Sequence, residues 1–290
     1  MSESIRIRVP ASTANLGSGY DCLGMALALH DTVVVRPGEG APGTAVVEVS
    51  GSGAGRVPTD ERHLVVRAMH ATLSELGVPA PGVRMWCENV IPHSRGLGSS
   101  AAAIVAGVAA AYALAGRDVH RDVERALRIA AGFEGHADNA AASLLGGLAI
   151  VWEDKAGFRG PRLVTHPDVR PVARVPTTVS TTRTTRGLLP ASVPHVDAAF
   201  AASRSSLAVH ALTRDPTLLF PATEDRLHQD YRESAWPETM RLIRELRDSG
   251  VAAAVSGAGP SVLAMLTDEE LPPGIDYGEF TPNVLLVDHS

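Results

Sequence analysis

Lysine and aromatic residues are both scarce in this sequence, and each scarcity narrows what the protein can be. Of the 26 basic residues only Lys155 is a lysine, and it lies in a polar turn with no glycine-rich loop before it. A phosphate loop of the type that depends on a lysine is therefore not expected. Aromatic residues make up 4% of the chain and hydrophobic residues 45%, so the core must consist of small aliphatic side chains, above all alanine.

Cysteine, excess basic charge and long apolar runs are also lacking. Cys22 and Cys87 are too few for a disulfide framework and have no metal-ligand spacing, which fits a reducing cytosol. The formal net charge of −6 disfavours a nucleic-acid surface, which needs a basic stripe. Residues 1–10 have no apolar signal-peptide core, and the longest apolar run, 101–115, is shorter than the ~20 residues that span a bilayer. We therefore expect a soluble, cytoplasmic protein that binds neither nucleic acid nor membrane.

Strand-like and helical patterns alternate along the 290 residues, with no repeat period and no low-complexity tract. This order predicts an α+β fold of the α/β two-layer type. Residues 10–24, rich in Ser, Thr, Asn and Gly, separate the first two predicted strands. A polar, glycine-containing segment near residue 155 predicts two domains, at 1–155 and 156–290. Strands are predicted at 5–9, 25–37, 44–51, 83–92, 148–152, 173–181 and 283–288 and as a pair within 251–267, and helices at 60–77, 101–115, 119–133, 138–147, 197–212 and 237–250.

The most informative segment is residues 95–116, RGLGSSAAAIVAGVAAAYALAG, in which a glycine–serine loop leads into an almost wholly apolar helix. Glycine lets the backbone approach a ligand closely, and Ser99 and Ser100 are good N-cap residues for that helix. The start of a helix offers unpaired N–H groups and a positive dipole end, which together attract phosphate. The loop therefore predicts a rigid anion site, with a glycine-rich turn that merely caps a core helix as the alternative.

Three motifs together extend this interpretation. PHSRGLGSSAA (92–102) lies between a predicted strand and a helix, VPASTANLGSGYDCLGMAL (9–27) precedes it, and SGAGPSV (256–262) forms a glycine turn between two apolar strands. In this order, across about 250 residues, they resemble the motifs of the GHMP kinases. The resemblance implies an N-terminal phosphate-loop domain, a ferredoxin-like C-terminal domain, and an active site between them.

Further segments resemble one branch of this family, the kinases that phosphorylate L-homoserine with ATP to give O-phospho-L-homoserine in threonine biosynthesis. They are EGHADN (134–139), TTRTTRGLLP (181–190) and LHQDYR (227–232). Homoserine carries a carboxylate, an ammonium group and a primary hydroxyl, and planar guanidinium groups suit a carboxylate best. The resemblance implies that Arg186 and Arg232 bind the carboxylate and that Asp21 and Asp138 neutralise the ammonium group. It places Asn15, His136 and Asn139 in the same substrate site.

The resemblance also implies residues for ATP and for Mg²⁺, which prefers hard oxygen ligands. Ser100 and Glu134 match the metal-side groups, and with Thr182 they are the predicted catalytic residues. The homoserine hydroxyl is expected to attack the γ-phosphate directly, without a dedicated side-chain base, because the loose transition state depends mainly on positioning. His63 stands where the family usually has asparagine on the adenine side. The predicted ATP-binding residues are Pro92, His93, Ser94, Arg95, Gly96, Leu97, Gly98, Ser99, Ser100, Ala101, Ala102, His63, Gly257 and Gly259.

Other interpretations stay open at this point. The protein could be a kinase for another small alcohol, or a nucleotide-binding regulator without activity on the same fold. Either arginine could be an ordinary surface residue, and His136 an ordinary partly exposed histidine. A dinucleotide-binding dehydrogenase fits poorly because neither 50–55 nor 256–261 matches the required glycine spacing, and a zinc site on His136 and Asp138 lacks a third ligand. Besides homoserine and ATP, a homodimer partner is an open alternative.

Overall fold

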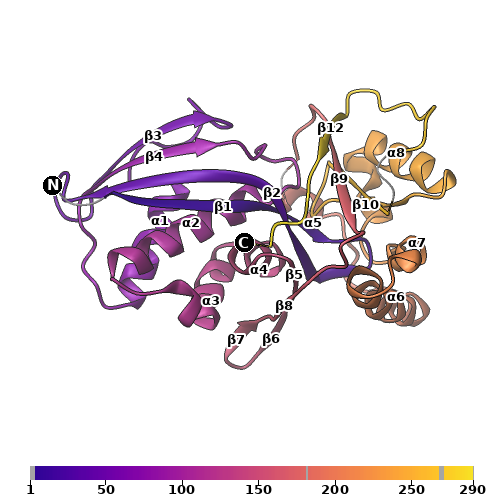
Figure 1. Cartoon of the computed structure of the whole chain (residues 1–290), viewed down its shortest axis with the longest axis horizontal. Helices are drawn as coiled ribbons and strands as arrows, with labels where there is room; N and C mark the ends of the chain where they lie inside the picture. The colour runs from indigo at the N-terminus through magenta and orange to yellow at the C-terminus, as the bar shows by residue number, and fades with distance from the viewer. Residues whose placement is uncertain (1–3, 181, 268–270, 290) are drawn as a thin grey trace.

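Two β-sheets lie side by side along the long axis of the molecule (Figure 1). The computed structural model describes residues 4–180, 182–267 and 271–289, and at 182, 183 and 282–284 it describes the backbone only. A large hydrophobic cluster includes residues from both sheets, and a smaller one packs between the second sheet and its last helix. Within the described residues no helix is long and apolar enough to cross a membrane.

The first sheet is built around one long strand. Strand β2 spans 19 residues, pairs with β1 along most of its length, and also pairs with β4 and β5. The strand order of this sheet is β3-β4-β2-β5-β8, with β1 paired to β2, and among these pairs only β3–β4 is parallel. The strands are β1 (Ile5–Asn15), β2 (Gly19–Pro37), β3 (Ala45–Gly51), β4 (Val83–Asn89), β5 (Leu148–Ile150) and β8 (Arg162–Leu163).

Four helices cover one face of this sheet: α1 (Leu64–Glu75), α2 (Ser99–Leu114), α3 (Val123–Glu134) and α4 (Asp138–Leu145) (Figure 1). Helix α2 is the alanine-rich helix, and it packs against β1, α1 and α4. Its small side chains allow close approach, because a Cβ at Gly107 would lie 2.3 Å from the carbonyl oxygen of Val65 on α1. The predicted buried helix is therefore present, and its close packing from Ala101 onward holds in place the start of α2, where Ser99 is half-buried and Ser100 exposed.

The second sheet is antiparallel and follows the order β10-β11-β9-β12, which is the strand order of a ferredoxin-like fold. Helix α8 is strongly amphipathic and turns its apolar side to this sheet. The strands of the second sheet are β9 (Arg170–Val175), β10 (Ala252–Val255), β11 (Val262–Leu266) and β12 (Thr281–Val284), and the helices of this half of the chain are α5 (Thr182–Arg186), α6 (His195–Thr213), α7 (Leu219–Ala222) and α8 (Pro237–Asp248). Elsewhere a small hairpin consists of β6 (Trp152–Asp154) and β7 (Gly157–Arg159). The 3₁₀ turns are Val119–Arg121, Pro216–Leu218 and Asp230–Ala235.

The clearest difference from the sequence prediction lies at residues 10–24. Strands β1 and β2 run well into residues 10–24, so the polar motif is mostly a β-hairpin rather than a loop. Its small polar side chains stay in the sheet because they find partners there: Ser12 donates to Oδ1 of Asn139 at 3.0 Å. Strand β8, the last strand of the first sheet along the chain, ends at Leu163, and β9 of the second sheet begins at Arg170, while the domain boundary near residue 155 stays a prediction. The end of the chain also returns to the first sheet, where the N–H of Ala28 donates to Leu286.

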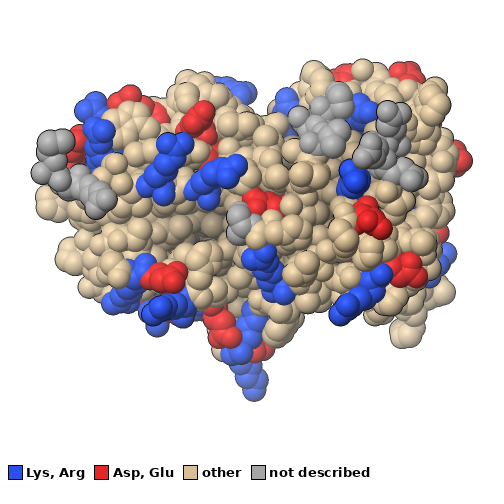
Figure 2. All heavy atoms as spheres, viewed as in Figure 1, with Lys and Arg blue, Asp and Glu red and all other residues tan. Residues whose placement is uncertain are grey.

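On the face shown in Figure 2, charged side chains do not gather by sign. Blue and red side chains are interspersed there, and no basic stripe crosses the described part of that face. This pattern agrees with the small net negative charge of the sequence.

Candidate active site

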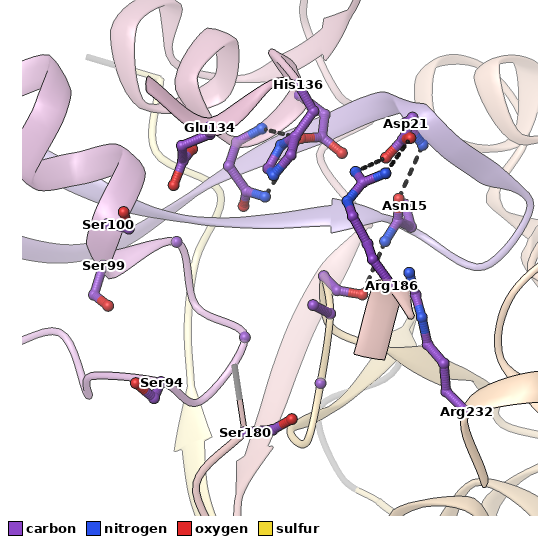
Figure 3. A pocket seen from close by; sticks show the side chains of 17 residues that line it. Asn15, Asp21, Ser94, Ser99, Ser100, Glu134, His136, Ser180, Arg186 and Arg232 are labelled. Atoms are coloured by element: carbon purple, nitrogen blue, oxygen red, sulfur yellow. Dashed lines mark hydrogen bonds and ion pairs between the residues drawn. The ribbon is translucent and has the colours of Figure 1, made fainter. Parts of the chain in front are cut away.

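A cavity of about 250 Å³ lies where the glycine–serine loop, the β1–β2 hairpin, α4, α5 and the β10–β11 turn converge (Figure 3). Segments far apart in sequence therefore share one site, and most of the predicted residues face it. Those that line it are Asn15, Asp21, Ser94, Gly96, Gly98, Ser99, Ser100, Glu134, His136, Asp138, Asn139, Arg186, Arg232, Gly257 and Gly259, and the prediction missed Ser180 and Ala258.

The remaining predicted residues lie elsewhere. Pro92, His93 and Arg95 line a neighbouring cavity of about 280 Å³ on the other side of Ser94. The side chains of Leu97, Ala101 and Ala102 are buried in the hydrophobic core, so they could contact a ligand only through their backbone. The N–H of Ala102 already donates to Gly98, which removes it as a phosphate donor.

Two further predictions need comment. His63 is buried and lines neither cavity, and its Nδ1 accepts the N–H of Val65 as the N-cap of α1. Burial lowers the pKa of His63, which suits this neutral acceptor role. The structure thus gives it a capping function. The side chain of Thr182 lies outside the described part of the chain, so its role stays a prediction.

The glycine–serine loop ends in a different cap from the one predicted. Gly98 is the N-cap of α2 in a left-handed conformation, with φ of 69°, and no side chain caps the helix. Ser99 and Ser100 are instead the first two helical residues. The first N–H groups of a helix have no carbonyl one turn earlier to bond, so those of Ser99, Ser100 and Ala101 are available to a ligand. The correction strengthens the anion site, because no serine side chain occupies its donors.

Glycine is required at two positions of this loop. A Cβ on Gly98 would lie 2.0 Å from Oγ of Ser12, and one on Gly96 would lie 2.3 Å from the carbonyl oxygen of Ser256. Oγ of Ser256 in turn donates to the carbonyl oxygen of Gly96 at 2.6 Å. The glycine–serine loop therefore packs directly on β1 and on the β10–β11 turn, and these contacts hold its backbone in place.

The β1–β2 hairpin is joined to the same turn. Asn15 has a positive φ of 69°, its Nδ2 donates to the carbonyl oxygen of Gly257 at 2.8 Å, and its Oδ1 accepts the N–H of Asp21 at 3.0 Å. The N–H of Gly257 donates back to Ala14. The Asn15 amide therefore uses both its nitrogen and its oxygen in hydrogen bonds that hold the β1–β2 hairpin against the β10–β11 turn.

Arg186 and Asp21 form an ion pair at one end of the cavity (Figure 3). Arg186 donates from Nη2 to Oδ1 and from Nη1 to Oδ2 of Asp21, at 2.6 and 3.0 Å. Its Nη1 also donates to the hydroxyl of Tyr20. Burial and the Asp21 charge raise the pKa of Tyr20, so the phenol is protonated. The predicted carboxylate ligand and the predicted ammonium ligand are thus paired with each other.

Arg232 differs from Arg186 in forming no ion pair with an acidic residue of the described part of the chain. It is only 1% exposed, yet it lines the cavity. Its Nε donates to the carbonyl oxygen of Thr185 and its Nη1 to Nδ1 of His228, at 3.3 and 3.1 Å. Among the described residues no carboxylate lies within ion-pair distance of it. A buried cation without an ion-pair partner is costly, although the more distant charges of Asp21 and Asp225 offset part of the effect of burial on the pKa of Arg232, so this arginine marks a place for an anion.

His136, Asp138 and Asn139 form a hydrogen-bonded group on the opposite wall, at the start of α4. Nδ1 of His136 lies 3.0 Å from Oδ1 of Asp138, and the same oxygen accepts the N–H of Asn139. Burial tends to lower the pKa of His136, but the hydrogen bond and charge of Asp138, with the charge of Glu134, raise it overall. The group presents a fixed, acidic surface to the cavity.

Glu134 and Ser100 are the residues present that suit Mg²⁺. Oε2 of Glu134 is buried and has no hydrogen-bond partner, and burial raises the pKa of this carboxyl despite the lowering effect of His136 and Ser100. An orphaned oxygen beside a serine hydroxyl is a donor set that a hard cation accepts. No cluster of three or more His, Cys, Asp or Glu in the described residues could hold a metal alone, so phosphate oxygens would have to complete the shell.

Some residues of the site had no usable signal in the sequence. Ser180 lines the cavity because its N–H donates to the carbonyl oxygen of Ser94, which attaches the segment after β9 to the phosphate loop. Tyr20 and His228 support the arginines, with ring centroids 5.1 Å apart. His228 was visible only as part of the LHQDYR motif, and nothing there indicated that it contacts Arg232.

Comparison with known proteins agrees with this geometry. Residues 63–147 match the family model for the GHMP kinases N terminal domain, and residues 208–275 match that for the GHMP kinases C terminal domain. The homoserine kinase of Clavibacter michiganensis is 52% identical over 266 residues, which cover 91% of this chain and 83% of that protein. The homoserine kinase of Streptomyces avermitilis is 49% identical over 267 residues, with 92% and 86% covered.

Solved structures show the same fold. The crystal structure of homoserine kinase from Cytophaga hutchinsonii superposes with a TM-score of 0.86 at 26% identity, covering 100% of this chain and 96% of that one. A mevalonate kinase from L. major superposes with a TM-score of 0.69 at 15% identity over 100% and 99%, which shows the fold alone. The chain therefore belongs to the GHMP kinase family, and the relatives that it resembles over most of its length are homoserine kinases.

Proposed function

We propose that this protein is an ATP-dependent kinase that phosphorylates the hydroxyl of L-homoserine, giving O-phospho-L-homoserine for threonine biosynthesis. The observation that carries the proposal is the position of Arg232. A buried guanidinium without a described carboxylate partner lines the same cavity as the N–H groups at the start of α2. One cavity thus offers a site for a small carboxylate beside a site for phosphate.

The nucleotide end of the cavity is the phosphate loop. The free N–H groups at Ser99, Ser100 and Ala101 and the positive end of the α2 dipole suit the phosphates of ATP. The neighbouring cavity, which His93 and Arg95 line, opens from the same loop and suits the rest of the nucleotide. Burial lowers the pKa of His93, so its ring is neutral and available to contact a base.

The amino-acid end holds the zwitterion. Arg232 pairs with the substrate carboxylate, and Asp21 and Asp138 face its ammonium group. Arg186 now pairs with Asp21, so substrate binding inserts an ammonium and a carboxylate between two groups that already attract each other. The substrate charges compensate both partners, which favours a ligand that carries both charges over one that carries a single charge.

The chemistry then depends on position. The homoserine oxygen forms a bond to the γ-phosphorus while the bond to the leaving ADP oxygen breaks, and the hydroxyl proton passes to a phosphate oxygen or to solvent. A loose transition state builds little charge on the attacking oxygen, so no side-chain base is needed. Ser100 and Glu134 would hold Mg²⁺, which when bound supplies charge neutralisation on the phosphates. The chain's own residues hold the two substrates in line and limit water.

The test is a coupled ADP-release assay on the purified protein with L-homoserine, L-serine, mevalonate and galactose in parallel. We expect turnover with homoserine and at least about tenfold lower kcat/KM with serine, whose hydroxyl is one carbon closer to the charged end and would fall short of the phosphate. Preferred turnover of mevalonate or galactose would establish a kinase for another alcohol. ATP binding without turnover of any of the four would establish a regulator.

A further inference from the structure

His228 is completely buried and contacts both the substrate end of the cavity and the β1–β2 hairpin. Its Nδ1 lies 3.1 Å from Nη1 of Arg232, and its Nε2 lies 2.8 Å from the carbonyl oxygen of Gly17. Its ring packs against Tyr20, whose ring also lies 5.5 Å from Cζ of Arg232. No feature of the proposed phosphoryl transfer requires this histidine.

The two hydrogen bonds fix the form of the imidazole. Arginine can only donate, so Nδ1 of His228 accepts, and a carbonyl oxygen can only accept, so Nε2 carries the proton and donates to Gly17. That is the neutral tautomer. Burial lowers the pKa of His228, and the charge of Arg232 adds to this effect against the opposing charges of Asp225 and Asp21, so the ring remains neutral at physiological pH.

Asp225 holds the histidine in place through the backbone. Its two carboxylate oxygens accept the N–H groups of Leu227, His228 and Gln229 at 2.8, 3.0 and 2.8 Å. The Asp225 carboxylate therefore accepts its hydrogen bonds from the main chain, and its oxygen Oδ2 lies 3.7 Å from Nε2 of His228. The acid orients the residue that contacts Arg232 but does not itself reach the guanidinium.

A neutral acceptor has a different effect on Arg232 from an acidic one. An aspartate at this point would compensate the guanidinium charge and compete with a substrate carboxylate. The imidazole restrains one N–H, while Thr185 restrains Nε, so the planar group is held by two of its five N–H groups and keeps its full charge. Preorganisation of this kind lowers the entropic cost of binding without occupying the site.

We infer that His228 is a positioning residue, a neutral hydrogen-bond acceptor that holds the Arg232 guanidinium in place for the substrate carboxylate without forming an ion pair with it. The inference rests on the proposed function, because it assigns Arg232 to the carboxylate of homoserine.

Two substitutions separate the two hydrogen bonds of the ring. In His228→Asn the amide oxygen falls near the position of Nδ1 and can still accept from Arg232, but the contact with Gly17 is lost. In His228→Gln the amide falls near the position of Nε2 and can still donate to Gly17, but the acceptor for Arg232 is lost. Each variant removes one hydrogen bond and keeps the other, and because asparagine is one methylene smaller than glutamine and leaves the larger void, the melting temperature of each is compared as well.

The experiment measures KM and kcat for L-homoserine at saturating ATP, the Ki of L-2-aminobutyrate, which keeps the carboxylate and lacks the hydroxyl, and the melting temperature. We expect His228→Gln to raise KM and Ki together by ~10-fold, the effect of a weakened charge-assisted hydrogen bond. Its kcat should stay within about threefold of wild type, since the acceptor acts on binding alone. His228→Asn should keep KM and Ki within about threefold, because it restores the acceptor.

The outcomes distinguish this inference from the proposed function. Wild-type protein that fails to phosphorylate homoserine overturns the proposed function and with it the carboxylate role of Arg232. Wild-type activity with equal KM changes in the two variants shows that His228 acts only in packing and overturns the inference alone. The same holds if KM is unchanged in His228→Gln, or if kcat falls while KM and Ki stay constant.

Discussion

Replacing Arg232 with methionine should remove homoserine binding while leaving the fold about as stable as before. Methionine is unbranched and of similar length, so it can occupy the buried channel of the arginine stem. The arginine is 1% exposed and has no carboxylate partner in the described part of the chain. If it is kept for a ligand, its removal must affect binding far more than folding.

The structure sets the size of both effects. Losing one partner of a buried, hydrogen-bonded charge pair costs about 3 kcal/mol, which corresponds to a fall of ~100-fold in kcat/KM for homoserine. For folding, two acceptors, the carbonyl of Thr185 and Nδ1 of His228, lose a donor, which costs about 1–3 kcal/mol each. In the opposite direction, methionine does not carry the desolvation cost of several kcal/mol that burial of the Arg232 guanidinium adds to the free energy of folding. The net change in the free energy of unfolding is therefore expected within about 2 kcal/mol.

The assay combines coupled ADP release at saturating ATP with urea unfolding. Arg244→Met is the matched control, because Arg244 is exposed and its ion pair with Glu233 contributes only about 0–1 kcal/mol. That variant should keep kcat/KM for homoserine. The reasoning is refuted if Arg232→Met keeps its KM for homoserine, or if it loses more than about 4 kcal/mol of stability, since the arginine would then be a structural residue.

Three other substitutions test the remaining features. Gly98→Ala should raise KM for ATP at least ~10-fold, because the added Cβ disfavours the left-handed backbone and would clash with Ser12, so the loop must shift. Gly43→Ala, at a similar φ of 77° but with open space around it, should leave KM for ATP unchanged. For His136 the folded pKa is raised above the ordinary 6.5 by Asp138, so the loss of unfolding free energy in His136→Gln should be largest below pH 6.5 and shrink as pH rises through the folded pKa; a loss that grows with pH would contradict this. Asp21→Asn should raise KM for homoserine about tenfold or more with kcat largely kept, and a collapse of kcat at constant KM would argue against its assignment to the ammonium group.

The sequence predicted the parts of the fold that depend on local pattern. The alanine-rich helix is present because it is apolar on nearly all sides and is buried, and the amphipathic helix near 237–250 is present because its apolar periodicity matches the one face that it buries. The pattern failed at residues 10–24, where small polar residues occupy buried strand positions. Ser12 and Thr13 are fully buried and hydrogen-bonded to α4 and to the β10–β11 turn, and such partners come from distant segments.

The site was predictable as a set of residues but not as a set of contacts. Motif resemblance named Arg186 and Arg232 equally, yet the structure pairs Arg186 with Asp21, whereas Arg232 forms no ion pair with any acidic residue that the structure describes. The loop motif named Ser99 and Ser100 as caps, whereas Gly98 takes that place. Both differences are decided by tertiary distances of a few ångströms, to which a one-dimensional pattern has no access.

These two differences have a common physical basis. At the start of α2 the glycine cap leaves N–H groups without acceptors within the helix, and at Arg232 a neutral histidine takes the place of an ion-pair partner among the described residues. A fold selected for stability alone would fill both, with a serine cap and with a carboxylate. Gly98 begins the helix without bonding its first N–H groups, and His228 positions the Arg232 guanidinium without forming an ion pair with it. Because both unfilled groups line one cavity, a single molecule pair, one with phosphates and one with a carboxylate, satisfies them together, and the chemistry between the two is phosphoryl transfer.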